Sequence, residues 1–252
     1  MRKFMNQPPQ NTRRARAGFS LIELLLVFLL LSVVLGAVFS QINLVQQRAR
    51  AEQVKLDIFQ ESREFLDQMV RDLHQAGYPN IRMFDTSGWS PPLNATPRND
   101  TRLAAGLTKI APDELVFEGD MDGDGQVDVL DYKFQPASAG NNCPCLQRSQ
   151  VLKSTGGTLF STLVQNVQSA GTAADPIFVA YKADGTVVAS ADTASAGGLL
   201  ALAGIKTVQI TLKVKAGVPD PKTGVAPETS LGSVVTLTNC SLAASGQPMS
   251  CQ

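Results

Sequence analysis

The sequence predicts an α+β fold in which one long N-terminal α-helix packs on an antiparallel β-sheet. Three observations lead to this prediction. An apolar run occupies residues 24–39 and is broken only by Ser32 and Gly36, and helical periodicity continues after it. Later segments alternate apolar and polar residues between turn-forming residues. With 252 residues and 44% hydrophobic content, the chain is long enough to bury a sizeable core.

Positive charge is concentrated at the amino terminus. All charged residues among the first 18 are basic, namely Arg2, Lys3, Arg13, Arg14 and Arg16. The remaining 17 basic and 22 acidic residues give the rest of the chain a net charge of −5. Nucleic acid is therefore an unexpected partner, because phosphate binding depends on clustered Lys and Arg. A local patch would be needed, and its candidates are Lys206, Lys213, Lys215 and Lys222.

Residues 19–45 form a candidate transmembrane helix. Glu23 is the only formally charged residue in this stretch, which is long enough to span a bilayer. A cleavable secretory signal and an ordinary signal anchor are the alternatives. Both must explain Glu23, because a carboxylate in hydrocarbon costs about 3 kcal/mol and usually has a partner or a function. A cut between Gly18 and Phe19 would create an amino group that can pair with Glu23 of a neighbouring subunit.

The segment around Glu23 resembles the signal of type IV prepilins, which a dedicated prepilin peptidase cuts after the glycine. The resemblance rests on the run Gly18-Phe19-Ser20-Leu21-Ile22-Glu23-Leu24-Leu25. It implies that residues 1–18 are a leader removed on maturation, that Phe19 becomes an N-methylated terminus, and that Glu23 supports docking into a filament. Ser40 stands where many major pilins have a helix-kinking proline.

The same resemblance extends more weakly to PilW-type minor pilins, through residues 115–134 and the run Val234-Val235-Thr236-Leu237-Thr238-Asn239. It implies a structural subunit of pilus assembly and initiation. A minor pseudopilin of type II secretion and a tip-located adhesin or DNA-binding pilin are the alternatives. The implied partners are the peptidase, major and minor pilins and the inner-membrane assembly machinery. The implied location is the bacterial inner membrane, with an extracytoplasmic head, and then the filament.

Catalysis is not expected from this sequence. His74 is the only histidine, and we find neither a nucleophile elbow nor a phosphate-binding glycine loop. We therefore expect a protein that is not an enzyme.

The helix is expected to continue well beyond the membrane segment. Val54, Ile58, Phe65, Met69 and Leu73 recur at helical spacing among charged residues. One helix over about residues 19–76 follows, with a length on the order of 85 Å. Residues 46–77 are then its amphipathic continuation, and residues 78–252 form a β-rich extracytoplasmic head.

Several short runs in the head have the pattern of strands. The clearest is residues 207–215, where apolar and polar side chains alternate. Asp184-Gly185 predicts a hairpin turn. The other predicted strands are residues 114–118, 127–134, 177–181, 186–189 and 233–238, and the predicted exposed loops are residues 191–198 and 217–229.

An Asp/Gly-rich loop within the head has the spacing of a twelve-residue calcium site. Acidic side chains occupy positions 1, 3, 5, 9 and 12, Gly125 is at position 6, and Gln126 offers its carbonyl at position 7. The predicted structural Ca²⁺ ligands are Asp120, Asp122, Asp124, Gln126, Asp128 and Asp131. The alternative is a metal-free turn, because Asp and Gly also suit tight hairpins. A strand beginning near residue 127 would place Asp128 and Asp131 on opposite faces.

The four cysteines lie beyond the apolar segment, where an oxidising compartment favours disulfides. Cys240 and Cys251 flank a small polar stretch, and we expect them to pair. Cys143 and Cys145 either close a tight ring or pair with the two cysteines near the C-terminus. Zinc is a weaker alternative, because C-x-C plus two distant cysteines lacks the usual ligand spacing.

Overall fold

The computed structural model describes residues 20–84, 97–137, 143–220, 223–239 and 241–242. The chain divides into two compact units, residues 1–49 and residues 50–252. The first unit contains the N-terminal part of helix α1 (Leu21–Gln75), and the second contains the rest of α1 and all the described strands. The long helix expected over about residues 19–76 is confirmed, and it continues through Gly36 and Ser40.

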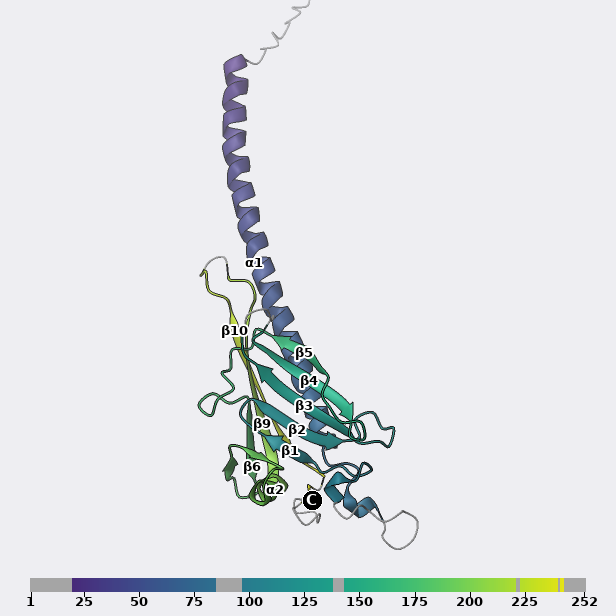
Figure 1. Cartoon of the computed structure of the whole chain (residues 1–252). Helices are drawn as coiled ribbons and strands as arrows, with labels where there is room; N and C mark the ends of the chain where they lie inside the picture. The colour runs from purple at the N-terminus through teal and green to yellow at the C-terminus, as the bar shows by residue number, and fades with distance from the viewer. Residues whose placement is uncertain (1–19, 85–96, 138–142, 221–222, 240, 243–252) are drawn as a thin grey trace, which may run out of the picture. The chain divides into compact units, whose positions relative to one another are not determined.

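The strands of the second unit form two antiparallel sheets, and Figure 1 labels all of these strands except β7 and β8. One sheet has the order β5-β4-β3-β2-β1-β8, and the other has the order β10-β9-β6-β7. The strand bounds are β1 (Leu107–Ile110), β2 (Glu114–Gly119), β3 (Asp128–Gln135), β4 (Cys145–Leu152), β5 (Phe160–Gln165), β6 (Phe178–Lys182), β7 (Val187–Val188), β8 (Ala191–Asp192), β9 (Ile205–Lys215) and β10 (Glu228–Thr236). The helical elements besides α1 are α2 (Ala196–Ala203) and two 3-10 turns, η1 (Ile81–Met83) and η2 (Pro97–Asn99).

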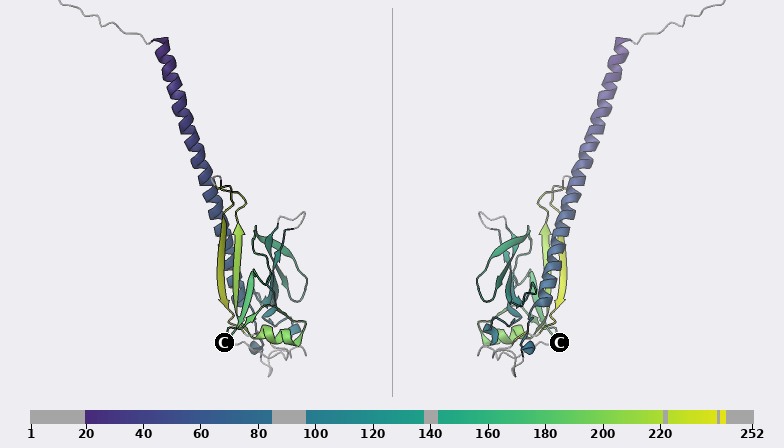
Figure 2. Two further views of the ribbon diagram at one scale, coloured as in Figure 1. Left: turned by 90° about the vertical axis from the view of Figure 1, so that its left-hand side faces the viewer. Right: turned by 90° about the vertical axis from the view of Figure 1, so that its right-hand side faces the viewer.

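One apolar cluster joins the second part of α1 to both sheets. Phe65, Met69 and Leu73 of α1 recur at helical spacing and are at most 6% exposed. Tyr132 of β3 meets the Phe65 ring edge-on at 5.9 Å between centroids and stacks on Phe117 of β2 at 6.1 Å. Figure 2 shows the two sheets of this unit as separate layers. Burial of these large apolar side chains between α1 and the sheets holds the unit together, which confirms the predicted α+β fold.

Strand β9 shows why alternation predicted the sheet. Val208, Ile210, Leu212 and Val214 all point into the core and are at most 2% exposed. The intervening polar residues point away from it, as a period of two requires. The Asp184-Gly185 turn is also confirmed: Gly185 has φ 82°, and β6 and β7 pair on either side of it.

Two segments predicted to be exposed loops contain regular structure instead. Residues 191–198 include β8 and the start of α2, which Ser195 caps by accepting a hydrogen bond from the Gly198 N–H at 3.0 Å. The loop predicted over residues 217–229 ends where β10 begins at Glu228. Strands β1, β4 and β5 were not predicted. β4 was missed because polar residues occupy both of its faces, so it has no clean alternation.

Candidate functional site

The first unit presents a helix surface made almost entirely of apolar side chains. Glu23 lies in the first turn of α1, where the helix dipole favours a carboxylate. The Glu23 and Leu24 N–H groups donate to the Ser20 carbonyl at 3.0 and 3.1 Å and begin the helix. Gly18 and Phe19, the predicted cleavage and methylation residues, lie outside the described residues.

The apolar side chains of this segment are exposed. Leu21 is 78% exposed, Phe28 59% and Val45 61%. By length and composition, α1 is the one described helix that can cross a membrane. Such a surface requires lipid or other apolar helices around it, because exposing an apolar patch of this size to water is unfavourable. The segment therefore has the length and composition of a membrane anchor.

The Asp/Gly loop connects β2 to β3 and is held by its own carboxylates. Asp120, only 6% exposed, accepts hydrogen bonds from the Gly123 N–H at 2.8 Å and the Gly125 N–H at 3.0 Å. Asp122 accepts from the Asp124 N–H at 3.2 Å. Gly123 and Gly125 have φ of 76° and 83°, a conformation that glycine adopts without strain. The loop geometry therefore explains both glycines.

Three of the six predicted calcium ligands come together in this loop. Oxygen atoms of Asp120, Asp122 and Asp124 all lie within 4.8 Å of one another. Gln126 donates through its backbone N–H and its side-chain amide to Asp124, both at 2.8 Å, and these bonds hold the pKa of the Asp124 carboxyl below its usual range. The donor set is made of hard oxygen atoms, which suits calcium.

Asp128 and Asp131 differ from those three because both belong to β3. Burial raises the pKa of Asp128, and the charges of the loop aspartates raise it further. Asp128 accepts a hydrogen bond from the Gln150 side chain at 2.7 Å. Three residues along the strand, Asp131 points to the opposite face, and the charges that act on it come from Glu114, Lys133 and Lys109. The structure therefore does not bring Asp131 to the loop.

The end of α1 is attached directly to the start of this loop. The Gly77 N–H donates to the Glu118 carbonyl, and the Asp120 N–H donates to the Tyr78 carbonyl, both at 2.8 Å. With its side-chain amide oriented so that both of its polar atoms are satisfied, Gln75 donates to the Asp120 carbonyl at 2.6 Å. Gly119 leaves no room for a side chain, because a Cβ there would lie 2.7 Å from the Gln75 carbonyl oxygen. The loop is thus fixed at its first residue.

A network of hydrogen-bonded side chains also connects α1 to Asp128, the residue of β3 that follows the loop. Asp72 accepts hydrogen bonds from the Tyr132 hydroxyl at 2.6 Å and from Arg148 at 2.9 Å. Arg148 also donates to the Gln150 side chain at 2.8 Å, and Gln150 donates to Asp128. Burial and the neighbouring Asp72 carboxylate raise the pKa of Tyr132, so its hydroxyl stays a donor. The sequence patterns described above did not predict this network.

One signal in the sequence could have revealed the network. Asp72 follows Met69 by three residues and therefore lies on the buried face of α1. A carboxylate on an apolar face requires a partner. Arg148 supplies it from β4 at a sequence separation of 76.

A second buried ion pair fixes the segment before β1. Lys153 Nζ lies 2.7 Å from Glu118 Oε2, and both side chains are at most 10% exposed. Lys153 also donates to the Leu103 carbonyl at 2.8 Å, and the Ala105 N–H donates to Glu118 at 2.8 Å. The pair therefore ties β2 and the segment after β4 to the residues that precede β1.

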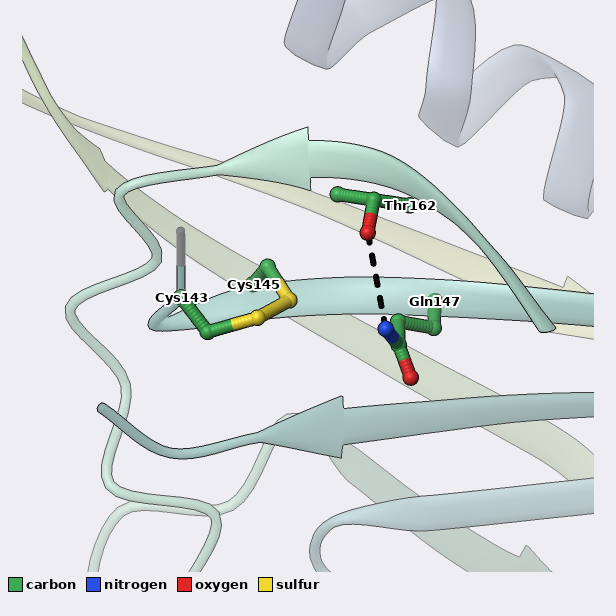
Figure 3. The surroundings of a disulfide bond; sticks show 4 residues. All are labelled: Cys143, Cys145, Gln147 and Thr162. Carbon is green, nitrogen blue, oxygen red and sulfur yellow. Dashed lines mark hydrogen bonds between the residues drawn. A yellow bond between two sulfur atoms is a disulfide. The ribbon is translucent and has the colours of Figure 1, made fainter. Parts of the chain in front are cut away.

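Cys143 and Cys145 form a disulfide with each other, with 4.4 Å between their Cα atoms. The ring lies at the start of β4, as Figure 3 shows. Nearby, Gln147 of β4 donates to the Thr162 hydroxyl of β5 at 3.4 Å. Of the two arrangements predicted for these cysteines, the structure has the tight ring. Cys240 and Cys251, predicted to pair, lie outside the described residues.

Two of the four lysines considered for a basic patch are paired with acids. Lys213 pairs with Asp175 at 2.6 Å, and Lys215 pairs with Glu228 at 3.4 Å. Lys222 lies outside the described residues. Ion pairing reduces the positive potential that phosphate binding requires.

One comparison with known proteins bears on these observations. Residues 13–39 match the model of the prokaryotic N-terminal methylation motif. The matched segment contains Gly18, Phe19 and Glu23, together with the first exposed turns of α1. No protein with a curated description matches the chain.

Proposed function

We propose that this chain, whose methylation motif indicates a protein of the type IV pilin or pseudopilin kind, is a minor pilin of the PilW type. One observation supports the proposal most strongly: the motif over residues 13–39 runs directly into an exposed apolar helix with Glu23 in its first turn. In this function, the chain primes or supports filament assembly and catalyses no reaction. The partners are a prepilin peptidase, other pilins and the assembly machinery of the inner membrane.

Processing at Gly18 is the first step to test. The full chain is expressed with a prepilin peptidase, beside a Gly18→Val variant, and the N-terminus is determined by mass spectrometry. The wild-type chain should begin at N-methylated Phe19, and the variant should retain residues 1–18. An intact leader in both chains, or a cut at another bond, contradicts the proposal.

Glu23 is the proposed docking carboxylate. After cleavage, its charge would pair with the amino group of a neighbouring subunit at the same membrane depth, which offsets the cost of a carboxylate in hydrocarbon. Glu23→Gln should leave the amount of chain in the membrane unchanged and lower its recovery in sheared filaments at least tenfold. Glu61→Gln, a matched change on the exposed part of α1 in the second unit, should alter neither.

The main alternative, a minor pseudopilin, differs from a minor pilin in the filament system to which it belongs. A minor pseudopilin would carry the same motif and the same apolar helix, so the test must be made in cells. Deleting the chain should abolish surface pili and leave protein secretion intact. Loss of secretion with normal piliation would instead assign the chain to a type II secretion system.

A tip-located adhesin or DNA receptor is the second alternative. The pairing of Lys213 with Asp175 and of Lys215 with Glu228 argues against a strong DNA site at these lysines. Salt-sensitive DNA binding by the full chain that is lost in Lys213→Ala would favour this alternative over assembly.

We also propose that the Asp120–Asp122–Asp124 group binds one structural Ca²⁺. The support is the oxygen-only donor set within 4.8 Å and the nearby Asp128 carboxylate, whose pKa is raised by burial and by the loop charges. A bound cation would relieve the repulsion among these carboxylates and fix the β2–β3 connection. Asp131 has no part in this site.

A further inference from the structure

Strand β10 presents an open edge that extends along its whole length. It is the last strand of the β10-β9-β6-β7 sheet and pairs only with β9 among the described strands. Its nine residues keep one unbroken register with β9. Figure 2 shows this strand at the border of its sheet.

The hydrogen bonds at the two ends of β10 show which of its backbone groups point away from β9 and have no partner among the described residues. The Ala216 N–H donates to the Pro227 carbonyl, and the Leu237 N–H donates to the Lys206 carbonyl, both at 2.8 Å. In an antiparallel ladder, residues that bond across alternate with residues that do not. The odd-numbered residues of β10 therefore bond to β9. The N–H and C=O groups that point to the open edge belong to Glu228, Ser230, Gly232, Val234 and Thr236, all of which are exposed.

This edge lacks the features that usually prevent strand addition. Native edge strands are commonly protected by charges, proline, a bulge or short length. Within β10, only Glu228 at its start is charged, and the strand contains no proline. By contrast, β7 and β8 have two residues each, and the ladder next to β5 is interrupted between Leu146 and Gln147. Of the described sheet edges, β10 is the one that best fits an added strand.

The chemistry of the edge specifies an extended polypeptide. Free donors and acceptors repeat at every second residue, a spacing that another β-strand matches along its length. The exposed side chains beside them are small and uncharged from Ser230 to Thr236, and Val234 is 65% exposed. An uncharged segment therefore meets neither repulsion nor an unpaired charge.

The direction of β10 argues against pairing with a second copy. Glu228 and Thr229 lie beside Lys55 and Ile58 of α1, whereas Asn239 donates to the His74 carbonyl at 3.1 Å, so β10 runs in the same direction as α1. An antiparallel pair of two β10 strands would reverse one α1, yet both helices must enter the membrane from one side. A parallel pair would place the two Glu228 carboxylates at the same end of the paired strands, where their like charges repel.

We infer that the open edge of β10 binds an extended, uncharged segment of a different pilin-like subunit by β-strand addition. This inference rests on the proposed filament function and names a surface through which the chain contacts its neighbour. Backbone hydrogen bonds supply the affinity, and small side chains on the exposed face allow close approach.

The test uses the full chain in cells that assemble the filament. A photo-crosslinking amino acid replaces Val234 at the edge or, as a control of similar exposure, Val218, which lies outside β10. Crosslinked peptides from sheared filaments are sequenced by mass spectrometry. Position 234 should give a crosslink to a strand of another pilin-like subunit, at a yield at least tenfold above position 218.

Two variants test the edge itself. Gly232→Pro removes one free N–H while the ladder to β9 stays intact, and it should lower the crosslink yield at least tenfold. Gly232→Ala keeps that N–H, and its Cβ lies 3.5 Å from the Ile210 carbonyl oxygen, an ordinary contact, so its yield should stay within twofold of wild type. Val234→Lys, made with the crosslinker at position 230, keeps the backbone and should reduce the yield in a folded chain even if the proline variant unfolds.

Several outcomes would overturn the inference. They are a crosslink from position 234 only to a second copy of the chain, no crosslink to a pilin-like subunit, or equal yields from Gly232→Pro and Gly232→Ala. The proposed function fails separately: it is contradicted if the wild-type chain is missing from sheared filaments. If the chain is present in filaments but changes at the β10 edge do not alter the crosslink yield, only the strand-addition inference is overturned.

Discussion

The Tyr132 hydroxyl donates a 2.6 Å hydrogen bond to Asp72 Oδ2, which ties β3 to the buried face of α1. Arg148 reaches the same oxygen atom at 2.9 Å, so the carboxylate is both ion-paired and hydrogen-bonded. Such a buried pair costs desolvation when it forms, but losing one partner leaves the other charge uncompensated. The contact therefore specifies where α1 lies on the sheet.

Removing Asp72 should destabilise the second unit strongly. Asp72→Ala leaves Arg148, whose side chain is 19% exposed, without its carboxylate and should lower the free energy of unfolding by about 3 kcal/mol. Tyr132→Phe removes one hydrogen bond and should cost about 1–2 kcal/mol. Urea unfolding of the detergent-solubilised chain, followed by near-UV circular dichroism, measures both. Equal, small losses would show that the ion pair contributes little.

Asp131 makes stability depend on pH. Burial, and next the Glu114 charge, raise the pKa of Asp131 to about 6, and its Oδ1 atom has no hydrogen-bond partner. Because the folded-state pKa lies above the unfolded value, the charged form destabilises the fold above about pH 6, and this penalty disappears as pH falls toward 4.

Asp131→Asn should therefore stabilise the chain by about 2 kcal/mol at pH 7.5 and by much less at pH 4. Unfolding midpoints across this pH range are the measurement. Asp67→Asn, on the exposed face of α1, is the control and should shift the midpoint little at either pH. A pH-independent difference for Asp131→Asn would contradict the assigned titration.

Gly119 is required by close packing against the end of α1. A Cβ in Gly119→Ala would lie 2.7 Å from the Gln75 carbonyl oxygen, a backbone atom that cannot move away cheaply, so we expect a loss of about 1–3 kcal/mol. Gly197→Ala in α2 meets nothing within 4 Å and should be neutral or slightly stabilising, because alanine favours helix. Thermal unfolding of the two variants compares them, and similar midpoints would exclude the steric explanation.

The proposed calcium site predicts a charge-specific loss of affinity. Asp124→Asn keeps an oxygen acceptor for the Gln126 N–H, so the metal-free loop should stay folded, but it removes one ligand charge. Calorimetric titration should show Ca²⁺ binding to the wild-type chain, at least tenfold weaker binding to this variant, and a lower unfolding temperature when a chelator is added. Asp113→Asn, outside the loop, serves as the matched control. Identical melting with calcium and with chelator would leave the loop as a metal-free turn.

Features that depend on residues close together in the chain could be predicted from the sequence. The apolar run with Glu23 and the basic residues before it was sufficient to predict a membrane helix with a prepilin-type signal, and the match over residues 13–39 agrees. Helical spacing identified Phe65, Met69 and Leu73 as core residues, and alternation identified β9. These patterns repeat with the period of the helix or the strand, so a short stretch of sequence is sufficient to identify them.

Contacts between residues that are distant in the sequence are visible only in the folded chain. Asp72 and Arg148 are separated by 76 positions, and no local pattern pairs them. Asp131 fits the calcium spacing in the linear sequence, whereas the strand predicted from near residue 127 places it on the face opposite to Asp128. The bounds of β3 decide between these two interpretations and put the two carboxylates on opposite faces. The open edge of β10 likewise requires the strand order. The sequence does not show which strand is the last of a sheet, and only that strand has backbone groups without a neighbouring strand.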